Sequence, residues 1–203
     1  MSPGEIRAYL IEKDARLTPL ISKSLDCPFF YRPTISQARL LSCLTEIVIG
    51  QQLSNDVAQK IWKTFRRNAK TRIALEEKIL GLENVAGKRE GLSGQKIKYL
   101  QGIVLALRTG ILQMSELQAM TDSEATHQLC RLKGLGTWSA EMFLMFGLHR
   151  LDIFSLSDYG LVQATKKLYG APQLSEKRLM KIANKWRPYR SVVSWHLWIA
   201  HDG

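Results

Sequence analysis

Residues 132–140 read Leu132-Lys133-Gly134-Leu135-Gly136-Thr137-Trp138-Ser139-Ala140, and this stretch decides how the chain is interpreted. Two glycines separated by one residue predict a helix end, a tight hairpin and a new helix, because glycine adopts backbone angles closed to other residues. The new helix would begin with unpaired N–H groups that suit a phosphate, and we expect Thr137 or Ser139 to cap it. A Gly-x-Gly pair by itself is more often an ordinary corner between helices, so the rest of the chain decides its meaning.

The overall composition favours a folded protein with an anionic partner. The chain has 203 residues, 45% of them hydrophobic, which is enough for one large or two small packed units. Its formal net charge is +11 and its isoelectric point is near 9.7. Such a balance favours a nucleic acid, whose phosphates attract cations and release counterions on binding. The alternative is a protein that is merely basic.

The cysteines point to a reduced, intracellular protein. Cys27, Cys43 and Cys130 are far apart in sequence and odd in number, so a disulfide framework or a zinc site is not expected. Three cysteines also exclude a four-cysteine iron–sulfur cluster within this chain. The histidines show no metal-binding spacing. With no apolar run of membrane-spanning length and no signal-peptide core, we expect a soluble monomer that contacts no membrane and is not secreted, cytoplasmic and nucleoid-associated in a bacterium or nuclear in a eukaryote.

Apolar periodicity predicts helices throughout the chain. No segment shows the alternation of a strand, so the predicted fold class is all-α, a compact bundle of roughly ten helices in two lobes. We expect residues 1–203 to form one unit, with a ligand cleft between its lobes. The predicted helices cover residues 1–26, 36–49, 54–68, 71–81, 94–107, 122–132, 138–148, 158–169, 175–186 and 189–200.

Two features outside the hairpin have a structural and a chemical interpretation. Asp158 starts a predicted helix, where capping is a common task for aspartate, yet an ionised carboxylate there can also stabilise a cationic sugar or orient a water molecule. Gly50-Gln51-Gln52 lies at a corner between two helices, where neither glutamine adds to a core. A solvated turn and a ligand-contacting loop explain this corner equally well.

Together these stretches resemble the helix–hairpin–helix, Gly/Pro-rich loop and aspartate signature of the HhH-GPD DNA glycosylases, and within them the alkyl-base (3-methyladenine) branch. The similarity covers roughly residues 36–200. Gly50–Ser54 is similar to the family's wedge loop, Gly91–Leu100 to its glycine–serine helix start, and Trp186–Trp198 to its C-terminal segment.

The resemblance implies a role for each matching position. Asp158 corresponds to the catalytic aspartate, and Trp138 and Trp198 to tryptophans of the base pocket. Gln52 falls where the family inserts a side chain into the duplex, although it is less apolar than the leucine of relatives. The substrate-binding set is Trp138, Trp198, Met142 and Tyr159. The DNA-binding set is Gln51, Gln52, Leu53, Ser54, Lys96, Lys133, Gly134, Leu135, Gly136, Thr137 and Arg190.

Departures from the family pattern refine these roles. Lys133 replaces the usual hairpin proline, and Met142 replaces a pocket tyrosine. Trp138 stands where bifunctional relatives carry a Schiff-base lysine, which argues against strand cleavage. The resemblance also implies a monovalent Na⁺ or K⁺ ion on the hairpin, held by the backbone carbonyls of Cys130, Leu132 and Leu135, and no other cofactor.

We therefore expect a monofunctional DNA glycosylase that releases alkylated purines, 3-methyladenine and 7-methylguanine, from double-stranded DNA by base flipping and hydrolysis. One alternative is a non-catalytic helix–hairpin–helix DNA-binding protein, although that reading gives no reason for an aspartate near phosphates. Another alternative is a glycosylase for a deaminated or etheno base, because the shape of the pocket decides the lesion.

Overall fold

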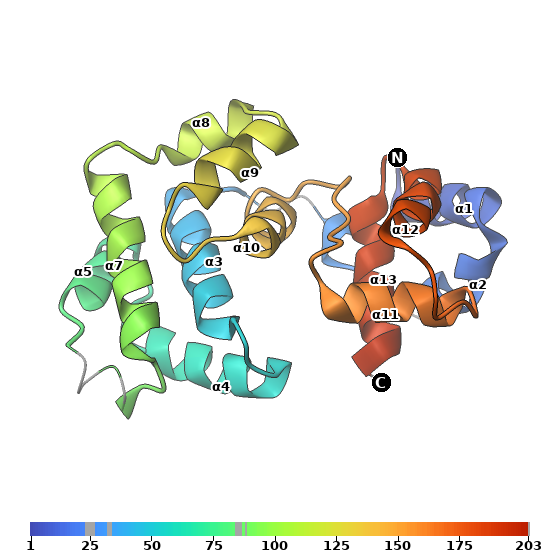
Figure 1. Ribbon diagram of the computed structural model, residues 1–203. Coiled ribbons are helices and arrows are strands. Elements are labelled where there is room, and N and C mark those ends of the chain that lie inside the picture. Colours follow the sequence, from blue (N-terminus) through green and yellow to red (C-terminus); the bar gives the residue numbers. More distant parts are fainter. Residues whose placement is uncertain (23–26, 32–33, 84–86, 88, 203) are drawn as a thin grey trace. The chain divides into compact units, whose positions relative to one another are not determined.

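The computed structural model describes residues 1–203 except 23–26, 32–33, 84–86, 88 and 203. Within these described ranges every regular element is a helix, which confirms the predicted all-α class (Figure 1). The chain divides into two compact units: unit 1 comprises residues 1–33 and 149–203, and unit 2 comprises residues 34–148. None of the helices in the described ranges combines the length and apolarity needed to cross a bilayer.

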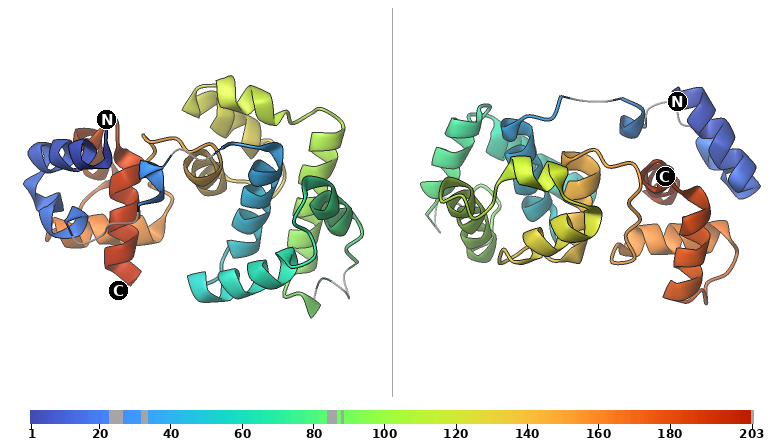
Figure 2. Two further views of the ribbon diagram at one scale, coloured as in Figure 1. Left: turned by 180° about the vertical axis from the view of Figure 1, so that it is seen from behind. Right: turned by 90° about the horizontal axis from the view of Figure 1, so that it is seen from above.

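Unit 2 is organised around the helix α3. This helix carries buried apolar residues on several sides, among them Leu40, Leu44 and Val48, and it packs against α4, α5, α7 and α10. Figure 1 and the left view of Figure 2 show α3 between α7 and α10. The elements of unit 2 are α3 (Gln37–Gly50), α4 (Asn55–Arg66), α5 (Arg72–Leu80), α7 (Gly94–Arg108), α8 (Met114–Ala119), α9 (Asp122–Cys130), α10 (Thr137–Met142) and the π-helical turn η3 (Phe143–Gly147).

Unit 1 is organised around the last helix, which packs against elements from both ends of the chain. Val192, Val193 and Leu197 of this helix are buried, together with Trp186 just before it. The elements of unit 1 are α1 (Pro3–Lys13), η1 (Ala15–Leu17), α2 (Thr18–Ile21), η2 (Pro28–Phe30), α11 (Tyr159–Leu168), α12 (Glu176–Ala183), η4 (Asn184–Trp186) and α13 (Arg190–Asp202).

The single helix predicted for residues 1–26 is wrong. Helix α1 ends at Lys13 because Asp14 is extended, with φ −155° and ψ 96°, and its buried carboxylate accepts hydrogen bonds from the Tyr169 hydroxyl and from Trp186 Nε1. These long-range bonds stabilise a break that local periodicity does not reveal. The end of the predicted helix, residues 23–26, lies outside the described residues.

Other boundaries agree with the sequence or differ by local chemistry. Ser36 and Ser93 cap α3 and α7 through their side-chain oxygens, close to the predicted starts of these helices at residues 36 and 94. The α9 cap is Thr121 in a reciprocal capping box with Glu124. Helix α8 was not predicted, and the helix predicted for residues 138–148 changes at Phe143 into the π-helical turn η3.

Candidate active site and DNA-contact loops

The hairpin, residues 131–136, is a tight turn packed on an aromatic ring. The Leu135 N–H donates to the Leu132 carbonyl at 3.1 Å. Gly134 has φ +94°, and a Cβ built on it would lie 2.2 Å from the Tyr99 ring. Glycine is thus required at residue 134 both for its backbone angle and for the space that Tyr99 occupies.

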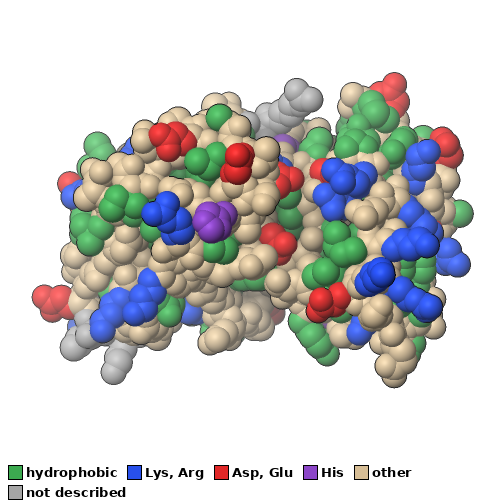
Figure 3. All heavy atoms as spheres, turned by 45° about the horizontal axis from the view of Figure 1, so that its top comes forward, with side chains coloured by type: hydrophobic (Ala, Val, Ile, Leu, Met, Phe, Trp, Pro, Cys, Tyr) green, Lys and Arg blue, Asp and Glu red, His purple; other side chains and the backbone are tan. Residues whose placement is uncertain are grey.

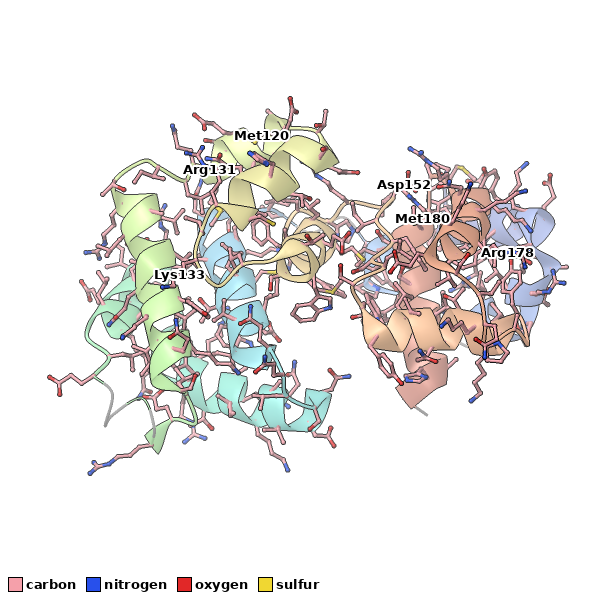
Figure 4. The ribbon with its side chains drawn as sticks, viewed as in Figure 1. Met120, Arg131, Lys133, Asp152, Arg178 and Met180 are labelled. Atoms are coloured by element: carbon pink, nitrogen blue, oxygen red, sulfur yellow. The ribbon has the colours of Figure 1, made fainter. Side chains whose placement is uncertain are left out.

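The other hairpin glycine is open to its surroundings. Gly136 has an extended backbone, and a Cβ built on it would meet no atom of the described residues within 4 Å. It is the N-cap of α10 and provides no side-chain cap, so the predicted capping by Thr137 or Ser139 is wrong. Thr137 and Lys133 are exposed, and Lys133 lies on the loop between α9 and α10 (Figure 4).

Gln51 joins the hairpin to the wedge loop, residues 50–54. Its side-chain amide donates to the Gly134 carbonyl at 2.8 Å and to the Ser139 hydroxyl at 2.9 Å. Ser139 is buried and therefore acts as a packing partner of the loop rather than as a helix cap. Gln51 is half-buried, and its amide joins two loops inside unit 2, while its contact with DNA stays a prediction.

Lys96 also supports the wedge loop, through carbonyls at and just after the end of α3. Its amine donates to the carbonyls of Ile49 and Gln51 at 2.7 and 2.8 Å, at the end of α3 where carbonyls lack helical partners. Burial lowers the pKa of this amine from its usual value. The cation of Lys96 thus supports the main chain beside Gln52, and its predicted contact with DNA stays a prediction.

Gln52 is the exposed tip of the wedge loop. Its φ of +59° lies in the left-handed region, which is unusual for a residue with a side chain. Leu53 is 37% exposed beside it, and Ser54 begins α4 without a side-chain capping bond. A conformation of this kind persists where surrounding contacts over-determine it, and here Gln51 and Lys96 supply such contacts.

Asp158 caps α11 and is held by two N–H donors. Its Oδ1 accepts from the Leu161 backbone N–H at 2.7 Å and from Trp198 Nε1 at 3.0 Å. The capping role predicted from the sequence is confirmed. Trp198 was predicted to line the base pocket, and the structure adds a bond from its indole edge to the carboxylate. Gly160 completes this corner, since a Cβ built on it would lie 3.5 Å from Asp158 Oδ1.

The remaining predicted residues fall into different environments. Tyr159, next to Asp158, is 77% exposed, and Trp138 at the start of α10 is half-buried. Met142 is only 5% exposed, so it presents almost no surface of unit 2 to a ligand. Arg190 donates to the carboxylate and the carbonyl of Asp152 at 2.7 and 2.6 Å, which makes it an internal support of the loop before α11 instead of a free phosphate ligand.

Comparison with known proteins agrees with this arrangement. No protein-family model matches the chain. Schizosaccharomyces pombe DNA-3-methyladenine glycosylase 1 is 27% identical over 173 residues, 83% of this chain and 76% of that protein. A Bacillus subtilis relative is 28% identical over 82% of this chain, which spans 60% of that relative's length.

Solved structures share the fold over almost the whole chain. A Bacillus halodurans DNA-3-methyladenine glycosidase is 29% identical, with a TM-score of 0.72 over 95% of this chain and 87% of that one. The S. pombe 3-methyladenine DNA glycosylase bound to abasic DNA has a TM-score of 0.81 over 98% and 97% at 23% identity. In sequence and in fold the chain is therefore similar to DNA-3-methyladenine glycosylases, in agreement with its resemblance to the HhH-GPD enzymes. Several of its sequence relatives bear names of the alkyl-base branch.

Sequence reasoning missed how this protein supports its loops. The bonds from Gln51 and Lys96 and the ring of Tyr99 join segments that are about 35 to 88 residues apart. One signal was present in the sequence: two glutamines at a helix corner, where neither adds to a core, for which a solvated turn and a ligand-contacting loop were equally good explanations. The identity of their partners required the fold.

Proposed function

We propose that this protein is a monofunctional DNA glycosylase that removes alkylated purines such as 3-methyladenine and 7-methylguanine from duplex DNA. The observation that carries the proposal is the carboxylate of Asp158, fixed at the start of α11 by the N–H groups of Leu161 and Trp198. Two N–H donors and the positive end of a helix stabilise a negative charge at this position. The names of the sequence relatives support the same substrate class.

The chemistry needs a fixed negative charge more than it needs an acid. Alkylation of a ring nitrogen makes the base cationic, so the base departs as a neutral molecule with the electron pair of the glycosidic bond. Positive charge develops on the sugar as that bond breaks, and the Asp158 carboxylate would stabilise it. A water oxygen then bonds to the anomeric carbon and gives up a proton, which leaves an abasic site.

Two aromatic residues of unit 1, the exposed Tyr159 and the half-buried Trp198, suit the extruded base. Tyr159 follows Asp158 directly in the chain. The indole of Trp198 donates a hydrogen bond to the Asp158 carboxylate, so this ring lies close to it in space. A flipped base is bound by stacking on such rings, and a cationic base gains a further attraction to their faces. Trp138 and the Gln52 tip of unit 2 are proposed as further DNA contacts.

The hairpin is proposed to hold a DNA phosphate, with a monovalent ion beneath it. Helix α9 ends at Cys130, whose carbonyl is among the last four of the helix and lacks an intrahelical partner. The Leu132 carbonyl accepts one bond, from Leu135, and a carbonyl oxygen has two lone pairs. Carbonyls are the ligands that K⁺ takes in proteins, so Cys130, Leu132 and Leu135 fit the ion, which would add positive charge near the phosphate.

The test is base release from methylated duplex DNA by the wild type, Asp158→Asn and Asp122→Asn. Asp122 is an exposed residue of α9, so its variant removes one charge without touching the proposed site. We expect the wild type and Asp122→Asn to release free 3-methyladenine or 7-methylguanine and to leave the strand intact until alkali is added. Asp158→Asn should bind DNA and release no base.

Turnover by Asp158→Asn at the wild-type rate would refute the role of Asp158. If the wild type binds DNA but releases neither base, the same assay on deaminated and etheno lesions separates a different substrate from a protein that only binds.

A further inference from the structure

A long segment rich in positive charge lies outside the hairpin and the Asp158 residue itself. Residues 166–190 contain eight Lys or Arg residues and a single acidic residue, Glu176. Two of the eight, Arg187 and Arg190, pair with Asp152 at 3.0 and 2.7 Å and so belong to the internal structure of unit 1. The others need a different explanation.

Five of these cations form what we call the α12 basic face. They are all exposed, and in the part of the chain that the structure describes none of them forms an ion pair. In Figure 3 blue side chains gather over this part of unit 1, and Figure 4 shows Arg178 at its periphery. The members of the α12 basic face are Lys167, Lys177, Arg178, Lys181 and Lys185.

Helix geometry places three of these five charges in a row. Lys177 and Lys181 are four residues apart on α12, and Lys185 follows four residues later in η4, so the three lie near one another on one side. The opposite side of α12 carries the buried residues Leu179 and Ile182. The cations therefore cannot turn inward, and the row is presented to solvent at intervals of about 6 Å.

This arrangement costs stability in the free protein. Like charges four residues apart on a helix repel one another. An ordinary solvated helix mixes both signs and gains from such pairs, whereas the cations of this face form no ion pair among the described residues, and Lys185 alone lies over an aromatic ring, that of Tyr169 at 5.9 Å. A polyanion with closely spaced charges would remove the repulsion and release its own counterions.

We propose that the α12 basic face is a second DNA-binding surface that contacts backbone phosphates of the duplex independently of sequence. The choice of DNA as the ligand rests on the proposed function, because a protein that acts on bases in a duplex must also hold the flanking backbone. The surface contributes affinity and no chemistry, since the α12 basic face contains neither Asp158 nor the residues bonded to it.

The test compares three proteins by fluorescence anisotropy on undamaged duplexes of about 10 and about 30 base pairs over a range of salt concentrations. The first is the wild type, and the second carries Lys177→Gln, Arg178→Gln and Lys181→Gln. The third carries Lys63→Gln, Lys70→Gln and Lys98→Gln, three exposed lysines scattered over unit 2, and so has the same net charge as the second.

We expect the α12 variant to bind the longer duplex at least about 10-fold more weakly at low salt, with a salt dependence reduced by about 0.9 for each lost phosphate contact. The scattered variant should change the salt dependence by less than about 1. Glu176→Gln, which removes the single acid, should strengthen binding. Circular dichroism and the melting temperature verify that each variant is folded.

Equal effects of the two triple variants would overturn the proposal, because net charge alone would then explain binding. So would an unchanged affinity for DNA together with a lost affinity for polyglutamate, which would indicate an acidic protein partner. The rate of base release at saturating enzyme should be the same in the α12 variant and the wild type. If the wild type releases no base, the proposed function fails while the binding comparison still decides this inference.

Discussion

The Asp158 corner of unit 1 and the hairpin of unit 2 are both built at the start of a helix, by opposite means. At α11 a side chain provides the functional atom, and Asp158 caps the helix with the carboxylate that we assign to chemistry. The N-cap of helix α10 is Gly136, which has no side chain. The main chain of the hairpin is held instead by Gln51, which donates to the Gly134 carbonyl from another loop. A function in a side chain can be read from the sequence, whereas a main-chain function depends on supports that come from distant segments.

The largest effect on stability is expected at one of the two hairpin glycines. Gly134→Ala should lower the free energy of unfolding by about 2 to 4 kcal/mol, because residue 134 has positive φ and its Cβ would overlap the Tyr99 ring. Gly136→Ala should lower it by about 1 kcal/mol or less and should weaken DNA binding, since only an approaching ligand would meet the new methyl group. Urea denaturation and duplex binding measure both. Equal destabilisation by the two variants would contradict the difference in packing.

Trp198→Phe tests whether the hydrogen bond from the indole to the Asp158 carboxylate contributes to base release. Losing the N–H donor to Asp158 should slow base release about 10- to 100-fold, the effect of about 1.5 to 3 kcal/mol from a hydrogen bond to a charged group. Binding to undamaged duplex should be unchanged, and Trp198→Phe keeps an aromatic ring for stacking. If base release survives in Trp198→Phe but is lost in Trp198→Ala, the ring matters and the bond to Asp158 does not.

The two units should also differ in their response to acid. His196 of α13 is buried, neither ring nitrogen has a partner among the described residues, and burial, with the charge of Arg7, lowers its pKa to about 4. The unfolded chain binds this proton below about pH 6.5, so the stability present above that pH is lost as pH falls toward 4. We expect a loss of about 2 kcal/mol between pH 7 and pH 5.

Denaturation curves of the wild type and His196→Leu measure this effect. The variant should lack this part of the pH dependence, while His127→Gln, at an exposed histidine of α9, should retain it. The same pH dependence in all three proteins would assign it to other groups.

The smallest expected effect concerns the bond between the hairpin and the wedge loop. Gln51→Leu should lower the free energy of unfolding by about 1 kcal/mol, because the Gly134 carbonyl and the Ser139 hydroxyl lose a donor. Gln51→Glu keeps the size and removes both N–H groups, so it should weaken the loops similarly. If both variants bind DNA as the wild type does, the hairpin is positioned without Gln51.

Much of the fold could be predicted from local pattern. The helices that begin near residues 36, 94 and 158 start where predicted, with Ser36, Ser93 and Asp158 as their caps, because an N-cap bond involves residues only three apart. The first helix was predicted too long because Asp14 is held by Tyr169 and Trp186, more than 150 residues away. Prediction failed where a buried polar group drew its partners from the other end of the chain.

The helical class, the hairpin with its glycines and the aspartate at the start of α11 could all be predicted from the sequence. Each depends on the backbone preferences or capping bonds of residues that are neighbours in the chain. Only the tertiary structure decided that Gln51 and Lys96 support loops, that Arg190 pairs with Asp152, and that the Trp198 indole holds Asp158. Those roles depend on which donors and acceptors meet when distant helices pack. A buried hydrogen bond is specified by both partners at once, and a linear pattern shows only one of them.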